Sequence, residues 1–538
     1  MNDPADLPLF TQPASTETAV EQGPRPHARA LAGRLSRSAP PMSHSHEPAH
    51  EQPVFEESAA SRVDDNDPTS EQSSRPAASM VDYTIVHEVR QRVIEAFQSG
   101  DEHRMARPIT LDQDEETITG LIDSHLTDLV NESLHRGGQA PKVAERRALA
   151  TAVHNAIFGA GRFEPLLELP GLENLEAYGH DNVWLEFADG RIEQGPPIAD
   201  SDEELIRDLQ QLARFSPSGE KDFSIATKRL RMALPDGSRL AAHAWLTPRP
   251  SLVIRKHRYI DTDLDESLRL GAVDQGLREF LAAAVIAGLN IIVCGAPGAG
   301  KTTLLRAMLN SLDPMKRIAT IESMFELGLH NLPHRHQRVF PAEAQPGGEP
   351  GPDGTPLGAH TLGSLFQDAL QMNADYTVVG EAVGKEFAIV IDAMTTGKGS
   401  MSTIHATSAS DAVERMSSLY RKAETSTTPE TASTLIAQAV DLIVYIDVVD
   451  ERQIGGRRHR HVSEVLALSP NNDTGVDPVV RELLWRPGPD GRAVPTGKRP
   501  EWLSKLRRAG FDPAYMEVGT QSWQKPLDLL IPMDGGQS

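Results

Sequence analysis

The sequence predicts an α/β protein in which a mostly parallel sheet with helices on both faces follows a smaller α+β domain and a helical segment. Three observations lead to this prediction. A buried strand, a glycine-rich turn and a helix follow one another between residues 290 and 309. Apolar strands then alternate with helices, which is the order expected of a parallel sheet. Before this domain, shorter strands alternate in polarity around turn residues, which is typical of antiparallel pairs.

Length and charge limit the classes of protein to consider. A chain of 538 residues is too long for one core, so we expect at most about three domains. With 53 Lys and Arg against 76 Asp and Glu, the formal charge is -23, which argues against nucleic-acid binding over a large surface. The single cysteine, Cys294, excludes an internal disulfide and a four-cysteine zinc site. We expect Cys294 to be a small core residue.

Residues 1–80 are predicted to be a disordered tail. They are rich in Pro, Ser, Glu, His and Gln, and they carry too few large apolar groups to offset chain entropy. A basic piece, Arg25 to Ser38, is a candidate for docking on a partner or on anionic lipid, but a solvated tail is the simpler interpretation. No signal peptide is expected. The apolar run from Phe280 to Cys294 is shorter than the ~18 residues of a spanning helix, so we expect a soluble, cytoplasmic protein.

Residues 81–158 are predicted to be a helical segment, either a small bundle or a cap on the next domain. Apolar side chains recur there at helical spacing, and a third helix is expected from Val143 to Ile157. The recurring positions are Ile85, Val89, Val93 and Phe97 in the first helix and Ile122, Leu126, Val130 and Leu134 in the second.

Residues 159–262 are predicted to be the smaller α+β domain. A hairpin is expected around Asp189-Gly190, an amphipathic helix from Asp202 to Arg214, and two more strands around Pro235-Asp236-Gly237. Three basic residues lie at the ends of the later strands, where they either face solvent or reach a phosphate bound on the next domain: Arg239, Arg255 and Lys256.

Residues 263–470 are predicted to be the larger domain. The expected strands are NIIVC, RIATIE, YTVVGE, SMSTIHA, DLIVYIDVV and VSEVLAL. Because parallel sheets place ligands beyond the carboxyl ends of their strands, we expect Gly295, Glu322, Glu381 and His405 on one edge. A surface loop is expected from Pro341 to Gly358. Residues 471–538 are predicted to be a weakly ordered tail interrupted by the short helix EWLSKLRRAG.

The turn of the first strand is a phosphate-binding loop. Gly295, Gly300, Lys301 and Thr302 satisfy G-x-x-x-x-G-K-[ST], in which backbone N–H groups and a helix N-terminus surround the β-phosphate. Lys301 reaches the β- and γ-phosphates, and the Thr302 hydroxyl ligates Mg²⁺. We therefore expect ATP and Mg²⁺ as cofactors. The residues expected to hold the nucleotide are Gly295, Ala296, Pro297, Gly298, Ala299, Gly300, Lys301, Thr302 and Thr303.

Three polar groups end separate strands after this loop: Glu322, Glu381 and His405. Hydrolysis of a triphosphate needs an acid near Mg²⁺, a group that orients the attacking water and cationic help at the γ-phosphate. One acid at a strand end is more often a solvated charge, but three polar groups that follow a phosphate loop favour a catalytic site.

These residues resemble the secretion and pilus motor ATPases of type II, type IV and Tad systems, closest to the CpaF-like Tad branch. The resemblance covers residues 159 to 468. It rests on GRFEPLL, LPDGSRL, SLVIRKH, GAPGAGKTTLL, TIESMFEL, VVGEAVGKE and GSMSTIHAT, in that order. It implies a RecA-like P-loop domain, with Glu322 as general base, Glu381 in the Walker B role near Mg²⁺ and His405 at the γ-phosphate. It also implies that Arg239 and Arg255 lie close to the nucleotide.

The chain departs from this family at four positions near the expected site. Ser323 stands where an acid is usual, and Gln371, Asn373 and Val383 stand where arginines are usual. Fewer cations around a triphosphate weaken charge stabilisation in the transition state, so slow turnover is one expectation. Arg335 and Arg338 are candidates to replace the missing charges.

The sequence therefore predicts an ATP-hydrolysing motor of a secretion or pilus-like apparatus. The resemblance implies a homohexameric ring, peripheral attachment to the cytoplasmic membrane and a polytopic membrane platform protein as partner, without zinc. Two alternatives stay open: a nucleotide-binding ring module with little hydrolysis, and a nucleic-acid-translocating motor, against which the acidic balance argues. The cargo and the direction of transport do not follow from the sequence.

Overall fold

The computed structural model describes most of the chain after residue 80. The described residues are 81–99, 111–137, 139–214, 219, 221–256, 261–345, 347, 356–382, 384–396, 399–471, 473, 477–520, 523 and 526–531. The predicted tail over residues 1–80, with its basic piece, lies outside them, as does Val383.

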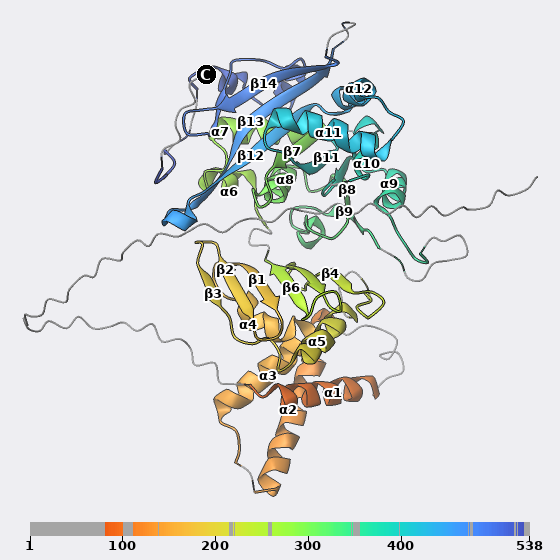
Figure 1. Ribbon diagram of the computed structural model, residues 1–538, viewed down its shortest axis with the longest axis vertical. Coiled ribbons are helices and arrows are strands. Elements are labelled where there is room, and N and C mark those ends of the chain that lie inside the picture. Colours follow the sequence, from red (N-terminus) through yellow and green to blue (C-terminus); the bar gives the residue numbers. More distant parts are fainter. Residues whose placement is uncertain are drawn as a thin grey trace, which may run out of the picture. The chain divides into compact units, whose positions relative to one another are not determined.

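The three helices expected from apolar spacing are present. Helices α1 (Tyr83–Ser99), α2 (Leu111–His135) and α3 (Val143–Phe158) pack around a small core of their own (Figure 1). Val89, Val93 and Ile118 are fully buried in it, whereas Leu134 is 48% exposed. The apolar stripe of α2 therefore leaves the core before the helix ends.

The α+β domain is a six-stranded antiparallel sheet with helices on one face. Leu175 of the sheet and Leu205 and Leu209 of α5 are fully buried in their common core. Its helical elements are η1 (Gly161–Phe163), α4 (Glu164–Leu167) and α5 (Asp202–Arg214). In spatial order its strands are β3 (Ile192–Gln194), β2 (Val183–Phe187), β1 (Leu172–Tyr178), β6 (Ser251–Arg255), β5 (Arg239–His243) and β4 (Arg229–Ala233).

Side chains alternate between the two faces of a strand, so this sheet also has a face away from its core. One row across that face carries charge, because Arg239 lies opposite Arg255, Arg255 opposite Asn174, and Asn174 opposite Glu186. This row supplies part of the site described below.

The larger domain contains a nine-stranded sheet among the described residues. The strands from β12 to β9 run parallel, and β13, β14 and β15 extend the sheet in antiparallel pairs. In spatial order they are β15 (Ala493–Pro495), β14 (Val479–Pro487), β13 (Arg458–Pro470), β12 (Leu442–Asp450), β7 (Ile291–Gly295), β11 (Met401–His405), β10 (Tyr376–Val379), β8 (Arg317–Glu322) and β9 (Arg338–Glu343).

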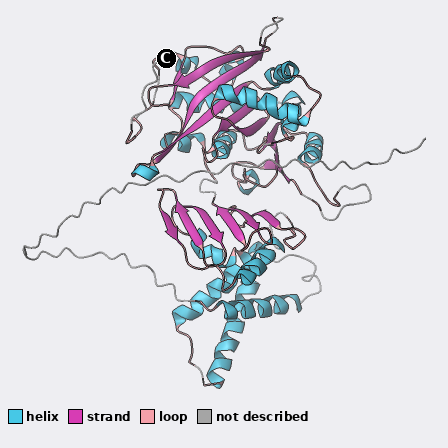
Figure 2. Cartoon of the chain, viewed as in Figure 1, coloured by secondary structure: helices cyan, strands magenta, loops and turns pink. Residues whose placement is uncertain are grey.

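Strand β7 is buried on both faces, as expected of a central parallel strand. Ile291 and Val293 contact one helical layer, and Ile292 and Cys294 contact the other. The first layer comprises α6 (Leu264–Arg269), α7 (Gln275–Ile286), α8 (Lys301–Leu309) and α13 (Leu503–Arg508). The second comprises α9 (Leu362–Gln371), α10 (Phe387–Thr396), α11 (Ala409–Ala423) and α12 (Pro429–Ala439) (Figure 2).

Side-chain caps start several of these helices where the sequence places Asp, Ser or Thr. The carboxylate of Asp274 accepts the N–H of Leu277 at the start of α7, and Ser408 and Thr428 cap α11 and α12 in the same way. Each such cap contributes roughly 1 kcal/mol. Three short 3₁₀ turns complete the domain: η2 (Leu329–Asn331), η3 (Arg452–Ile454) and η4 (Pro513–Met516).

The structure corrects the prediction that residues 471–538 are a weakly ordered tail. Strands β14 and β15 lie within this range, and Trp485 is fully buried against Phe280 with 4.5 Å between the ring centroids. The short helix that was expected is α13. The prediction was wrong because β14 is stabilised by pairing with β13 and β15 by pairing with β14, and the Pro- and Gly-rich sequence around these strands does not indicate such pairing.

Part of the predicted surface loop is also a strand. Residues 341–343 belong to β9, which forms the edge of the sheet. An edge is where a sheet tolerates proline, so Pro341 is compatible with this strand. None of the described helices combines the length and the apolar character that crossing a membrane requires.

Candidate functional site

The phosphate loop follows β7 directly and leads into α8. Two of its glycines are required by their surroundings. A Cβ on Gly295 would lie 2.3 Å from the carbonyl oxygen of Ile446 on β12, and Gly300 has a φ of 96° immediately before α8. Any other residue would clash at Gly295, and a side chain at Gly300 would strain the backbone. The loop thus has the shape that its sequence pattern predicts.

Lys301 begins α8 and lies against the loop. Its ammonium donates to the carbonyl oxygens of Gly295 and Ala296, at 3.2 and 3.0 Å. Lys301 is buried, and this burial lowers the pKa of its ammonium, while the carboxylate of Glu381 acts in the opposite direction. A cation held in a poorly hydrated position interacts strongly with an added anion.

A chain of polar contacts links Lys301 to the ends of two neighbouring strands. The Nζ of Lys301 lies 3.0 Å from Nδ1 of His405, and Nε2 of His405 lies 2.9 Å from a carboxylate oxygen of Glu381. An ammonium can only donate and a carboxylate can only accept. Nδ1 of His405 therefore accepts from Lys301, and in the neutral ring this leaves the proton on Nε2, the nitrogen that lies near Glu381.

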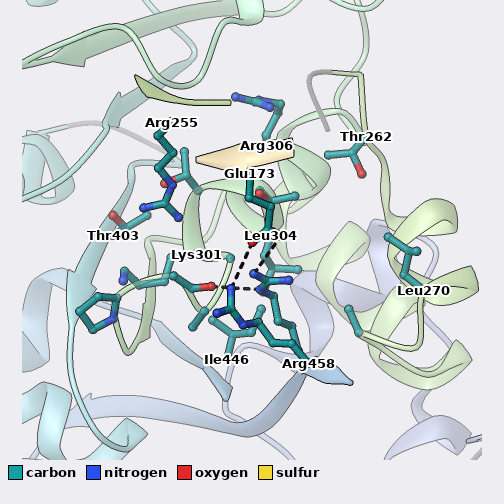
Figure 3. Close-up of a pocket in the computed structure, with 18 of the residues that line it drawn as sticks. Glu173, Arg255, Thr262, Leu270, Lys301, Leu304, Arg306, Thr403, Ile446 and Arg458 are labelled. Atoms are coloured by element: carbon teal, nitrogen blue, oxygen red, sulfur yellow. Dashed lines mark hydrogen bonds and ion pairs between the residues drawn. The ribbon is translucent and has the colours of Figure 1, made fainter. Parts of the chain in front are cut away.

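These three residues line a cavity of about 700 Å³ (Figure 3). A volume of this size is within the range of small-molecule and cofactor sites. Lys301, Thr403 and Arg255 lie on one side of the view and Leu270 on the other (Figure 3). The expected nucleotide-binding residues from Pro297 to Thr303 also line the cavity.

The α+β domain supplies cations to this cavity. Arg239, Arg255 and Lys256 all line it. Arg239 forms an ion pair of 2.8 Å with Glu326, and the ammonium of Lys256 donates to the carbonyl oxygen of Leu167. The sequence left open whether these side chains face solvent or reach a phosphate bound on the next domain. In the structure they line the same cavity as the phosphate loop.

Of the four residues predicted to be catalytic, Glu322 is the one that does not line the cavity. It is buried, and one carboxylate oxygen accepts the backbone N–H groups of Glu326 and Leu327, each at 2.8 Å. Arg306 of α8 donates to the carbonyl oxygens of the same two residues. The loop after β8 is thus held from both sides, and it presents Glu326, rather than Glu322, to the cavity.

Burial raises the pKa of Glu322 to about 7 from an ordinary 4.5, against the smaller effect of the two N–H groups that it accepts. The folded protein therefore binds more protons than the unfolded chain between these values. The free energy of unfolding therefore falls as pH rises from 4.5 to about 7.

We expect Glu322→Gln to remove this dependence. The unfolding free energy of the wild type should fall, relative to the variant, by up to about 3 kcal/mol between pH 5 and pH 8. Urea unfolding of both proteins at several pH values measures this difference. If the unfolding free energies of the two proteins changed with pH in parallel, the raised pKa of Glu322 would be contradicted.

Two further cations at the cavity were missed by the sequence analysis. Arg458 and Arg460 lie at the start of β13, and Nε of Arg460 donates to the carbonyl oxygen of Gly298 in the phosphate loop at 3.0 Å. Arg458 lies 3.2 Å from Glu173 of β1. The available signal was the basic run RRHRH before VSEVLAL, but pairing with β12 is what brings it beside the loop.

Of the three positions where cations were thought to be lost, the two that the structure describes lie away from the cavity. Gln371 and Asn373 are exposed near the end of α9 and, within the described part of the chain, do not line the cavity. Ser323 does not line it either. Arg335, one suggested replacement, pairs with Asp261 and Asp263. The other, Arg338, donates to the carbonyl oxygen of Met315 at 3.4 Å.

The oxygen donors expected to hold Mg²⁺ fit that ion. Thr302 and Glu381 both line the cavity, and hydroxyl and carboxylate oxygens are ligands that Mg²⁺ prefers. Cys294, by contrast, is fully buried, and burial raises the pKa of its thiol. It is an inert core residue, as expected.

Comparison with known proteins identifies the family. The family model described as "Type II/IV secretion system protein" matches residues 236–466. A protein of Mycobacterium tuberculosis described as a conjugal transfer protein is 31% identical over 298 residues, covering 52% of this chain and 78% of its own. This chain belongs to the type II/IV secretion system protein family.

Two further proteins are similar to this chain. Protein VirB11 of Agrobacterium fabrum is 32% identical over 185 residues, covering 34% of this chain and 50% of its own. The VirB11 ATPase of the Brucella suis type IV secretion system covers 59% of this chain and 96% of its own, at 24% identity and a TM-score of 0.30. The family model and the relative from Mycobacterium tuberculosis confirm the resemblance to secretion ATPases, and the sheet with helices on both faces confirms the predicted α/β fold; the CpaF-like branch stays a prediction.

Proposed function

We propose that this protein is an ATP-hydrolysing motor of a type II/IV secretion or Tad-like pilus apparatus. The observation that carries the proposal is the chain of contacts from Lys301 through His405 to Glu381, at the edge of the sheet where the phosphate loop lies. It supports hydrolysis because it joins a phosphate-binding cation to an acid through a group that can relay a proton.

Each residue of the site has a role that its position supports. The loop from Gly295 to Gly300 and the N-terminus of α8 bind the β-phosphate, since backbone N–H groups there have no partner within the helix. When nucleotide binds, the ammonium of Lys301 exchanges its hydrogen bonds to the carbonyl oxygens of Gly295 and Ala296 for contacts with the γ-phosphate. Thr302 and Glu381 hold Mg²⁺, which when bound neutralises charge that develops between the β- and γ-phosphates.

His405 accepts from Lys301, and its Nε2 lies 2.9 Å from a carboxylate oxygen of Glu381, so its ring lies between the two groups. Glu381 orients the attacking water as well as the metal. For the role of general base, the geometry favours Glu381, at the cavity, over Glu322, whose carboxyl holds the loop that presents Glu326. Glu322 is accordingly a positioning residue in this proposal.

The cations around the cavity favour an ATPase over a module that binds nucleotide without hydrolysing it. Arg239 and Arg255 come from the α+β domain and Arg458 and Arg460 from β13. They supply positive charge at the cavity in a chain that lacks several arginines usual in the family, and such charge stabilises the transition state of phosphoryl transfer.

The wider setting is proposed from the family. Relatives are described as conjugal transfer and type IV secretion proteins. We propose that this chain forms a homohexameric ring at the cytoplasmic face of a membrane and acts on a polytopic platform protein, as a member of the CpaF-like Tad branch. Hydrolysis moves the two domains that share the cavity, and this movement is passed to the platform.

The test is phosphate release by the wild type and by Glu381→Gln, in the presence of Mg²⁺ and ATP. The variant keeps the size of the side chain but loses the charge, so turnover should fall by roughly 100-fold or more while nucleotide affinity changes little. The control is Glu414→Gln, whose carboxylate is exposed on α11 and pairs with Arg481, and which should keep full turnover.

Equal turnover in Glu381→Gln and wild type would contradict the assigned site. Wild-type protein that binds ATP but releases no phosphate, alone or with membranes, would favour the nucleotide-binding ring instead. Turnover that rises only when DNA is added would favour the nucleic-acid motor.

A further inference from the structure

The last described segment of the chain, Pro526 to Ile531, is fastened to the hairpin formed by β12 and β13. It follows an anchor at Trp523, whose indole N–H donates to the carbonyl oxygen of Ala493 at 2.8 Å and whose ring lies 4.5 Å from the guanidinium carbon of Arg492. The segment lies beyond the residues that the family model matches.

Glu451, at the turn of the hairpin, holds the segment with both oxygens. One accepts the backbone N–H of Leu530 at 2.8 Å and the other that of Ile531 at 2.9 Å. Glu451 is buried, and these two N–H groups hold the pKa of its carboxyl below the ordinary value. The carboxylate is therefore charged at neutral pH, and hydrogen bonds to a charged acceptor are the stronger kind.

A second contact fixes the middle of the segment. Nε2 of His459 lies 3.2 Å from the carbonyl oxygen of Asp528, so His459 donates there. His459 itself lines the cavity beside the phosphate loop. The segment is thus tied to the wall of the cavity at Asp528 and to the hairpin turn at Leu530 and Ile531.

These ties place one apolar side chain at the cavity. Leu527 lines it. Leu270 also lines it, on the side away from Lys301 and Thr403 (Figure 3). Phosphate groups are attracted to the end with Lys301, so a bound nucleotide directs its base toward the other end. An apolar side chain there can pack on the flat face of a base.

We propose that the segment Pro526–Ile531 is a strap that forms the base-side wall of the nucleotide site. Leu527 contacts the base, and Glu451 is the positioning residue that holds the strap in place. The inference rests on the proposed function, because it names the part of the nucleotide that this wall recognises. The ligand of the strap is the base of a nucleoside di- or triphosphate, not the phosphates.

The test compares ADP with inorganic tripolyphosphate, which has the phosphates and lacks the base. Binding of both is measured by calorimetry on the full chain with Mg²⁺ present. Leu527→Ala should weaken ADP binding roughly five- to tenfold, because a partly buried leucine loses three carbon groups, and should leave tripolyphosphate binding unchanged. The matched control is Leu370→Ala, whose side chain is 46% exposed on α9 and does not line the cavity; it should bind both as the wild type does.

A second variant, Glu451→Gln, tests separately whether Glu451 holds the strap in place. The NH₂ group of the amide replaces one carboxylate oxygen and cannot accept a backbone N–H of the strap. The strap should therefore detach, and ADP binding should weaken as much as in Leu527→Ala. The double variant should be no weaker than either single one, because both changes remove the same contact. Melting curves of each variant establish that the fold is kept.

Two results would overturn the proposal: ADP affinity unchanged in Leu527→Ala, or equal losses for ADP and tripolyphosphate. Wild-type protein that binds neither ligand would contradict the proposed function itself. Wild-type protein that binds both, with Leu527→Ala unchanged, would leave the proposed function in place and reject the strap.

Discussion

Lys301→Ala is expected to abolish measurable ATP hydrolysis and to weaken nucleotide binding roughly 10- to 100-fold. The substitution removes the only charged group of the phosphate loop, and loss of one charge-stabilising group in such a site costs on the order of 100-fold or more in turnover. It also leaves the acceptor Nδ1 of His405 without its donor. Phosphate release and calorimetric binding of ADP measure the two effects.

Lys316→Ala is the matched control, since Lys316 is exposed and lies outside the cavity. It should hydrolyse ATP as the wild type does. Because Lys301 is 7% exposed, a melting curve must accompany the assay to separate lost chemistry from lost folding. A folded Lys301→Ala protein that keeps wild-type turnover would reject the site.

Trp485→Ala is expected to destabilise the full chain by roughly 3–5 kcal/mol, the range measured when a buried aromatic side chain is removed. Trp485 of β14 is fully buried and packs on Phe280 of α7, which also contacts Trp502 and Phe511. The substitution therefore opens a cavity where the C-terminal strands meet the helical layer. Urea unfolding monitored by circular dichroism measures the loss.

Trp184→Ala provides the comparison, because the same side chain on β2 is 39% exposed. It should cost less than about 1 kcal/mol. If the two variants were equally stable, strands β14 and β15 would not belong to the core of the larger domain.

The sequence predicted the strands of the parallel sheet, except for the edge strand β9, and the shape of the phosphate loop because both depend on neighbours in the chain. Ile291, Ile292 and Val293 form an uninterrupted apolar run, which only a strand buried on both faces accommodates. The rule that parallel strands place ligands at their carboxyl ends brought Glu381 and His405 to the same edge as Lys301, where their contacts are found.

The sequence could not predict which acid of TIESMFEL faces the cavity. Glu322 and Glu326 are both near the end of β8, and the choice is made by Arg306, which holds the carbonyl groups of the loop from a different helix. Arg460 and Leu527 escaped notice for a related reason. Arg460 contacts Gly298, 162 residues away along the chain, and Leu527 is held near the cavity by a contact between Asp528 and His459, which are 69 residues apart, so no local pattern predicts either placement.

By itself, the sequence determined that this chain carries a phosphate loop at the end of a buried parallel strand, within a two-domain arrangement typical of secretion ATPases. Only the tertiary structure decided that residues after 471 complete the sheet, that Glu322 holds a loop, and that a C-terminal segment reaches the cavity. The physical reason is that glycine conformation and apolar periodicity are local, whereas strand pairing, burial of a charge and contact across a cavity are made by residues that folding alone brings together.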